Sequence, residues 1–385
     1  MRQIYFSNTI FALLAAVISI TCFTACNSTP VEDNSTPAED NSTPAEDNST
    51  TSEDNSTPVE EDFQQLDPSS IILDPPFEAL NFIEDIQDLP GNDSLALNKL
   101  HQKYPKFWVD YSEDILKIGD ANKISTIREL RRFVKHPDIQ ETLKAIDTTS
   151  GDKAYLQSVE KTLEEGFKRF HAFRPQDTIP TIIWMPSGFN FAIYPRKEYV
   201  AVGVEWFIGP DHPIVGLLPP DKFPHYQQLR MHPDLMAGDT FRGWLLVYFS
   251  GSGYTGERCI DDILYWGKVL WLMKKCLPEL HDHLLMDWTP DKLHWAEANE
   301  SAIWLELQPS KVLFETNRSI YKRWLSDGPF TKAGSIPQES PDRLGIWMGW
   351  RIVEDYMDRN PETTIEELFN EQDHIPFLKS YRPEH

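Results

Sequence analysis

The sequence predicts an α+β fold that is predominantly helical and contains one small antiparallel sheet at about residues 181–204. Three observations support this class. Through the first third of the folded part, apolar residues recur every three or four positions, which is the spacing of one helix face. Short β-branched and aromatic runs then follow, as is typical of strands. Helical signals return from Asp221 onward.

The early elements can be placed from these patterns. Helices are expected at Asp93–His101, Ile124–Val134 and Tyr155–Phe170. Strands are expected at Thr181–Met185, Phe189–Tyr194 and Tyr199–Val204. Pro195–Glu198 lies between the last two runs and has the composition of a turn. The three short runs together account for the predicted antiparallel sheet.

A buried helix is expected around residues 260–275. Asp261–Asp262 at its start and Lys274–Lys275 at its end match the helix macrodipole, and Val269–Met273 is apolar on all sides. Cys259 and Cys276 are 17 positions apart, which is roughly 25 Å along a helix. A disulfide needs Cα atoms within about 7 Å, so both cysteines are predicted to be free thiols.

Another helix is predicted from Ser340 to about Arg359. Ser340–Asp342 would supply an N-cap, a proline at the first helical position and an acid in the first turn. Gly345 and Gly349 follow on one side of this helix. Each costs about 1 kcal/mol relative to alanine, and glycines at this spacing usually let another backbone approach closely. Internal packing is the favoured explanation, and a docking partner helix is the alternative.

The N-terminus has the features of a lipoprotein export signal. Arg2 supplies a positive charge, and Thr9–Phe23 is an apolar stretch of signal-peptide length. The stretch ends in Phe23-Thr24-Ala25-Cys26, which resembles the lipobox cleaved by lipoprotein signal peptidase. Residues 1–25 are therefore expected to be removed, and Cys26 is expected to carry acyl chains that anchor the protein in a membrane.

Residues 26–65 are predicted to form an acidic, disordered tether, followed by a single globular domain at residues 66–385. A unit of Asn-Ser-Thr-Pro-Val/Ala-Glu-Asp recurs every seven residues, and residues 27–62 contain 11 acids and no Lys or Arg. The whole chain has a formal net charge of −24, of which the tether contributes −11 and the signal +1. Residues 63–385 therefore carry −14, which disfavours nucleic acid as a partner.

The sequence contains none of the common catalytic motifs. The mixture of helices and a small sheet is similar at fold level to zinc metallopeptidases, but no His-Glu-x-x-His occurs among the eleven histidines. No Gly-x-Ser-x-Gly elbow and no phosphate-binding glycine loop is present either. We therefore expect no metal, no cofactor and no enzymatic activity.

The C-terminal half carries a series of motifs from about residue 180 to the end of the chain. They are Gly203-Val204-Glu205-Trp206-Phe207-Ile208-Gly209, Pro224-His225-Tyr226 with Arg230, Gly267-Lys268, Trp295 with Asn299-Glu300 and Trp304, Pro329-Phe330-Thr331-Lys332, Ser340-Pro341-Asp342-Arg343-Leu344-Gly345, Trp347-Met348-Gly349-Trp350, and Ser380-Tyr381-Arg382-Pro383. In this order they resemble the gliding-motility lipoprotein family GldB. Val204-Glu205 and Asp342 depart from the residues that the family more often has there.

The resemblance implies an envelope lipoprotein needed for gliding over surfaces and linked to the type IX secretion machinery. Its partners would be the membrane, through Cys26, and proteins of that machinery. The expected location is the outer membrane facing the periplasm, with the cell surface and the inner membrane as alternatives. The resemblance supplies no known reaction.

Six polar residues of these motifs are candidates for structural or partner-binding roles. They are Glu205, Arg230, Lys268, Asn299, Glu300 and Arg343. Glu205 and Glu300 could form a catalytic pair of carboxylates in a glycan hydrolase. They could equally be buried acids that pair with the motif cations in an ion network.

Arg343 is expected to need an acid on another element, because a cation in the first turn of a helix opposes the positive end of the dipole. Glu300 is the expected partner, and an Arg343 that points into water is the alternative. Most of the twelve tryptophans lie in helical apolar stripes and are expected in the core. A glycan- or cell-wall-directed hydrolase or lectin, or a degenerate metallopeptidase-like protein, is the alternative function.

Overall fold

A computed structural model describes residues 66–252, 256–308 and 312–383. These residues form one compact unit, and its class is the predicted one, mostly helical with one small sheet. Cys26 and the segments predicted as signal and tether lie outside the described residues. None of the helices described is both long enough and apolar enough to cross a bilayer.

The sheet has four strands in the order β1-β2-β4-β3. The strands are β1 (Ala79–Asn81), β2 (Thr181–Met185), β3 (Ile193–Pro195) and β4 (Tyr199–Gly203). β2 is parallel to both β1 and β4, and only the β3–β4 hairpin is antiparallel. The prediction of an antiparallel sheet was therefore wrong. β3 lies at the edge of the sheet, and β4 lies between β2 and β3, so that β4 pairs in parallel with β2.

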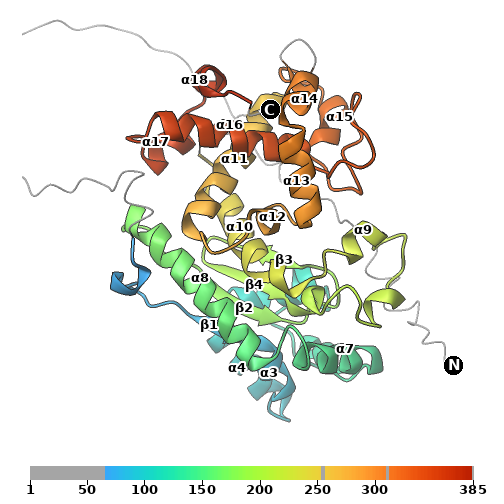
Figure 1. The fold of residues 1–385 in the computed structure, drawn as a ribbon. Helices are drawn as coiled ribbons and strands as arrows, with labels where there is room; N and C mark the ends of the chain where they lie inside the picture. Colours follow the sequence, from blue (N-terminus) through green and yellow to red (C-terminus); the bar gives the residue numbers. More distant parts are fainter. Residues whose placement is uncertain (1–65, 253–255, 309–311, 384–385) are drawn as a thin grey trace, which may run out of the picture. The chain divides into compact units, whose positions relative to one another are not determined.

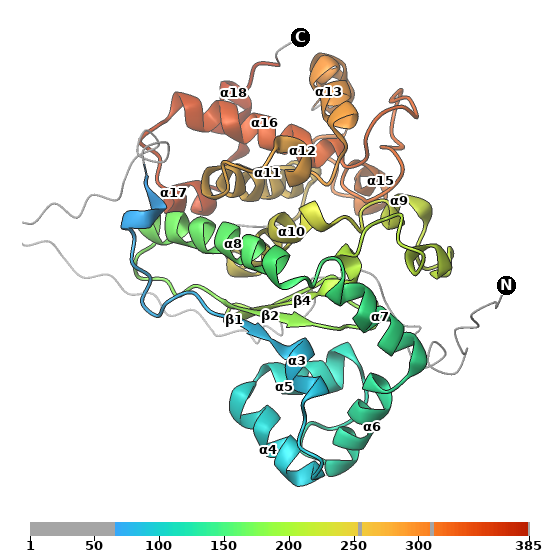
Figure 2. The same cartoon turned by 60° about the horizontal axis from the view of Figure 1, so that its bottom comes forward.

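Helices cover both faces of this sheet. On one side are α8 (Lys153–Phe173) and α10 (Met236–Tyr248), and on the other are α3 (Phe82–Gln87), α4 (Asp93–Lys103), α5 (Phe107–Asp110) and α6 (Ile124–Val134) (Figures 1 and 2). Burial on both faces explains why β2 and β4 are apolar runs without alternation. The helices predicted from the early periodicity are α4, α6 and α8, and each is confirmed to within three residues at either end.

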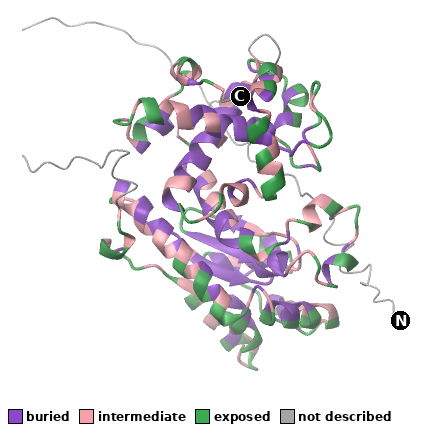
Figure 3. Ribbon diagram, in the orientation of Figure 1, coloured by how far each residue is buried: buried purple, intermediate pink, exposed green. Residues whose placement is uncertain are grey.

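The C-terminal part is a helical layer built on α11 (Cys259–Cys276) and α16 (Leu344–Arg359). The two helices pack closely along their lengths, and both are largely buried (Figure 3). Around them lie α12 (Asp282–Leu285), α13 (Pro290–Ala298), α14 (Glu300–Leu307), α15 (Arg318–Tyr321), α17 (Ile365–Asn370) and α18 (His374–Ser380). Cys259 and Cys276 are buried free thiols, as predicted.

The remaining elements are two further helices and a set of short turns. They are the helices α7 (Pro137–Asp147) and α9 (His225–Gln228), the π-helical turn η2 (Tyr111–Ile115), and the 3₁₀ turns η1 (Pro68–Ser70), η3 (Val204–Phe207), η4 (Val215–Leu217), η5 (Pro233–Leu235) and η6 (Lys322–Trp324).

Internal packing explains the glycines of α16. A Cβ at Gly349 would lie 2.0 Å from the carbonyl oxygen of Ile263 on α11, and a Cβ at Gly267 would lie 2.2 Å from the carbonyl oxygen of Gly349. A Cβ at Gly345 would lie 2.9 Å from the carbonyl oxygen of Trp324. The three glycines therefore lie directly against backbone atoms of the same domain. Internal packing, the favoured explanation, is confirmed.

The tryptophans of the helical stripes belong to the core. Trp271, Trp347 and Trp350 are buried, and Trp266, Trp295 and Trp304 are partly buried and pack against the core. Two of the buried tryptophans nevertheless line a cavity, which is described below.

Candidate functional site

A cluster of buried and partly buried arginines and aspartates joins four segments of the C-terminal half. We call it the arginine–aspartate cluster, and it consists of Arg230, Asp239, Arg242, Asp287, Asp342 and Arg343. Two members are on α10, one follows α9, one lies between α12 and α13, and two lead into α16. Charged groups are buried only when they are paired, so the cluster fixes these segments relative to one another.

Arg343 is the centre of the cluster. Its Nη1 donates to Asp287 Oδ2 at 2.9 Å, and its Nη2 donates to the carbonyl oxygen of Met286. Its Nε forms an ion pair with Asp342 Oδ2 at 3.2 Å, without the alignment of a hydrogen bond. Arg343 and Asp287 both have left-handed backbones, with φ of 56° and 51°. Such strain in non-glycine residues persists only where the surroundings hold it in place.

Asp342 has no exposed surface and is satisfied from three directions. It accepts hydrogen bonds from Arg230 Nη2 at 2.5 Å, Trp288 Nε1 at 3.1 Å and the backbone N–H of Gly328 at 3.1 Å. Burial would raise the pKa of Asp342, but the positive charges of Arg343 and Arg230 outweigh it and hold the pKa below its usual value. Asp342 is therefore an ionised structural acid.

Asp239 and Asp287 both contact Arg242, and their pKa values are shifted in opposite directions. Arg242 holds Asp287 with two hydrogen bonds of 2.9 and 3.0 Å. Burial opposes ionisation of Asp287, but the charges of Arg242 and Arg343 prevail and lower its pKa. Burial, together with the negative charge of Asp287, raises the pKa of Asp239 to about 8. Near neutral pH, Asp239 is the acid of this pair that holds a proton.

Replacing Asp239 by Asn is expected to remove a pH dependence of stability. Between about pH 4, where an unfolded aspartate loses its proton, and about pH 8, the folded chain keeps a proton that the unfolded chain has lost. Asp239 therefore lowers the free energy of unfolding as the pH rises through this window. Asp239→Asn should gain stability relative to the natural chain from pH 5 to pH 8 in urea unfolding.

The matched control for this measurement is Asp147→Asn, which changes an exposed carboxylate on α7. Its stability difference from the natural chain should be flat over the same range. A flat difference for Asp239→Asn as well would mean that Asp239 is ionised in the folded chain.

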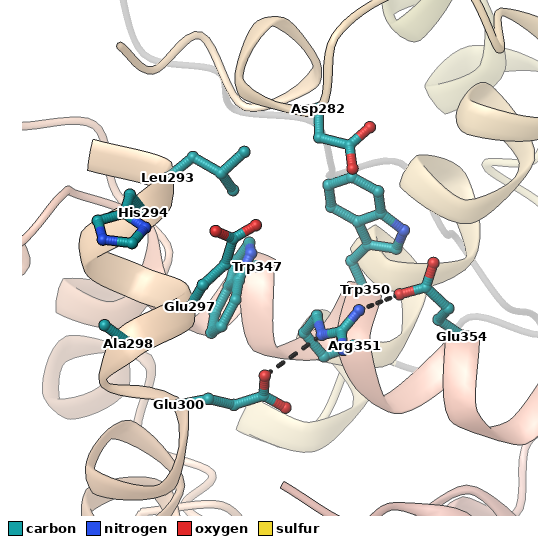
Figure 4. A pocket seen from close by; sticks show the side chains of 10 residues that line it. All are labelled: Asp282, Leu293, His294, Glu297, Ala298, Glu300, Trp347, Trp350, Arg351 and Glu354. Carbon is teal, nitrogen blue, oxygen red and sulfur yellow. Dashed lines mark hydrogen bonds and ion pairs between the residues drawn. The ribbon is translucent and has the colours of Figure 1, made fainter. Parts of the chain in front are cut away.

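A cavity of about 440 Å³ opens between α13 and α16, and we call it the α13–α16 cavity (Figure 4). Its volume is within the range of small-molecule pockets, roughly 300–1,000 Å³. Trp347 and Trp350 line it from α16, and both are almost wholly buried. The ionisable groups around it are Asp282, His294, Glu297, Glu300, Arg351 and Glu354.

Arg351 connects two carboxylates of the cavity. Its Nε lies 3.4 Å from Glu300 Oε2, and its Nη1 donates to Glu354 (Figure 4). Glu300 is 2% exposed and also accepts a hydrogen bond of 2.8 Å from the Tyr381 hydroxyl. Burial raises the pKa of Glu354, and the charge of Arg351 offsets this only in part. An aromatic wall with several carboxylates could bind a ligand rich in hydrogen-bond donors.

The predicted pair of Glu300 and Arg343 does not form. Arg343 contacts Asp287 and Asp342, whereas Glu300 pairs with Arg351, two turns further along α16. The prediction was wrong because the helix begins at Leu344 and not at Ser340. Arg343 is its N-cap in a left-handed conformation, which turns the guanidinium toward Asp287.

Glu205 and Glu300 do not converge with each other or with the predicted cations. Glu205 has no exposed surface, and its Oε1 accepts from the backbone N–H and hydroxyl of Ser187 and from the backbone N–H of Phe189. Burial raises its pKa against these hydrogen bonds. Glu205 therefore holds the loop after β2, and its pairing with Arg230, Lys268 or Arg343 was a wrong prediction.

Lys268 and Asn299 make local contacts. Lys268 Nζ donates to the carbonyl oxygen of Glu371 at 2.7 Å and lies 5.1 Å from the centre of the Phe377 ring. Burial lowers the pKa of Lys268 to about 8. Asn299 Nδ2 donates to the carbonyl oxygen of Trp295 at 2.7 Å, at the break between α13 and α14. Lys268 thus ties α11 to the segment after α17, and Asn299 marks a helix end.

Several site residues were not singled out from the sequence. Arg242 and Glu354 look like members of ordinary solvated helix faces, and Asp287 lies in a short loop. The only available signal was the spacing of Arg351 and Glu354, and of Asp239 and Arg242, three apart on their helices. In the three described ranges, no group of three or more His, Cys, Asp or Glu side chains is arranged to hold a metal ion.

Comparison with known proteins agrees with the motif series. The model of the family described as "Gliding motility protein GldB" matches residues 64–383, which includes every described residue. No curated protein and no solved structure matches the chain. The family match covers most of the chain and implies a role related to gliding motility. The chain belongs to the GldB family of gliding motility proteins.

Proposed function

We propose that this protein is a non-catalytic envelope lipoprotein that supports gliding motility and the associated type IX secretion machinery. The observation that carries the proposal is the family match over residues 64–383. The chemistry of the fold supports a scaffold role, because the three arginines of the cluster pair with Asp287 and Asp342 in the interior. Buried charges that are paired in this way can fix segments in place.

The proposed anchor is a lipid on Cys26, followed by the acidic tether. A stable anchor needs more than one acyl chain, which a lipidated N-terminal cysteine supplies. Stretched fully, 40 residues could span about 130–140 Å. The folded part could then reach partners well away from the membrane surface. We place it on the periplasmic side of the outer membrane.

Replacing Cys26 by Ala is expected to release the protein from the membrane and to abolish gliding. The measurement is membrane fractionation together with colony spreading in cells that carry only the variant. Cys22→Ala is the matched control, because Cys22 lies in the predicted signal and would be removed. Normal membrane attachment of a Cys26→Ala chain from which residues 1–25 have been removed, as checked by mass spectrometry, would refute the anchor. Release from the membrane with normal gliding would show that the anchor is not needed for motility.

The proposed partners are proteins of the motility and secretion machinery. Residues 63–385 carry a net charge of −14, so a partner with a basic surface fits this body best. Cross-linking in cells, followed by mass spectrometry of what copurifies with the intact lipoprotein, tests this directly. Recovery of envelope proteins of that machinery would support the proposal. Recovery of the lipoprotein alone would contradict it.

A further inference from the structure

Two polar groups that line the α13–α16 cavity pair with no other described residue. The Trp347 side chain is 1% exposed, and its Nε1 has no hydrogen-bond partner among the described residues. Figure 4 shows the nitrogen-bearing edge of this indole on the cavity side, and Glu297 is among the other side chains that line the cavity. Glu297 likewise has no hydrogen-bond or ion-pair partner in the described part of the chain. A donor and an acceptor that no other described residue engages thus face the same cavity.

These two groups determine which hydrogen-bonding groups a ligand of the cavity needs. Trp347 Nε1 needs an acceptor, and the Glu297 carboxylate needs a donor. A hydroxyl group is both donor and acceptor, so hydroxyls of one molecule can engage both groups. Of the other carboxylates of the cavity, Glu300 and Glu354 are held in place by Arg351 and can accept further hydrogen bonds.

Other ligand classes fit less well. A lysine or arginine side chain would pair with Glu297 but would leave the Trp347 N–H without an acceptor, since these cations only donate. An anionic ligand would meet Asp282, Glu297, Glu300 and Glu354 against one arginine. An apolar ligand would bury carboxylates without partners, which is costly.

We infer that the α13–α16 cavity binds an uncharged sugar residue, through Glu297 and Trp347 Nε1. The volume of about 440 Å³ suits a small ligand of this class, and the aromatic wall supplies the apolar contact that sugar rings use. This inference does not depend on the proposed role in motility.

The test is ligand-observed NMR of the full-length chain with defined probes. The sugar probes are glucose, mannose and N-acetylglucosamine, each also as its trisaccharide. Glucuronate and Nα-acetyl-lysine methylamide serve as anionic and cationic probes of similar size. At least one uncharged sugar should bind, and it should bind more tightly than either charged probe. The inference is overturned if no uncharged sugar binds or if either charged probe binds more tightly than every uncharged sugar.

Two variants locate the binding. Glu297→Gln removes the charge of an exposed side chain while keeping its size, and it should weaken sugar binding about tenfold. Trp347→Phe removes Nε1 and keeps most of the packing, with a similar loss expected and folding checked by thermal unfolding. Asp291→Asn is the control, because Asp291 is exposed on the same helix and does not line the cavity. Unchanged binding by Glu297→Gln would exclude this cavity as the site.

Discussion

Replacing Arg343 by Met is expected to lower the free energy of unfolding by about 3–5 kcal/mol, the usual cost of removing one partner from a buried ion pair. The reason is that Asp287 and Asp342 would lose their shared cation while both stay buried. Neither acid can be neutralised cheaply at neutral pH, since other arginines also hold their pKa values low. The measurement is equilibrium unfolding in urea.

A surface arginine provides the matched control. Arg132 has 76% of its side chain exposed and pairs with Glu129 one turn earlier on α6. Arg132→Met should cost less than about 1 kcal/mol, as is usual for exposed pairs. A loss of similar size in both variants would show that Arg343 is not part of a buried network.

Double-mutant cycles can identify the true partner of Arg343. Arg343→Met combined with Asp287→Asn should show a coupling energy of about 1–3 kcal/mol, because the two side chains are in direct contact. Arg343→Met combined with Glu300→Gln should be additive within about 0.5 kcal/mol, as for groups with no shared partner. The reverse order of the two couplings would restore the pairing predicted from the sequence.

The case of Arg343 shows what could and could not be predicted at this site. The sequence correctly indicated that a cation at this helix start needs an acid on another element. It could not indicate which acid, because the answer depends on left-handed backbones at Arg343 and Asp287. Ser340-Pro341-Asp342 has the residues of a typical helix start, so the sequence predicted a helix from Ser340. The helix begins at Leu344. Local patterns describe the chain one segment at a time, whereas this cluster brings four segments together.

The same distinction applies to the fold. α6 could be placed at its observed ends and β2 at its observed residues, because both have strong local patterns. β1 could not be predicted, since it is only three residues long and precedes its partner strand by about 100 residues. Without β1, the sequence pattern predicts a meander of antiparallel strands, and the parallel pairings of β2 cannot be predicted. The cavity was missed for a related reason, because its acids come from separate helices.

Helix α16 links the features described above. Arg343 fixes its start, Gly349 sets its contact with α11, and Trp347 and Arg351 face the α13–α16 cavity. The cavity wall is therefore part of a helix that is fixed at two points. Ion pairs fix its N-terminal end, and close backbone packing fixes its middle. Such a wall is pre-organised, which reduces the entropic cost of binding.

Replacing Gly349 by Ala is expected to destabilise the protein by about 3 kcal/mol, the upper end of the usual range for overpacking. Helix propensity alone predicts the opposite sign, because alanine is favoured over glycine in a helix by about 1 kcal/mol. The structure reverses that expectation, since the new Cβ would lie 2.0 Å from the carbonyl oxygen of Ile263. Backbone cannot move aside as a flexible side chain can, so α11 and α16 would have to separate.

Two further glycines serve as comparisons for this prediction. Gly267, on α11, lies opposite Gly349, and Gly216 has open space around it. Gly267→Ala should cost a similar amount, because its Cβ would lie 2.2 Å from the carbonyl oxygen of Gly349. Gly216→Ala should be neutral or stabilising by up to about 1 kcal/mol, since nothing lies within 4 Å of that Cβ. Urea unfolding of the three variants under one set of conditions gives the comparison. A stabilised Gly349→Ala would mean that α11 and α16 are further apart than described, and the cavity wall would then lose its fixed position on α11.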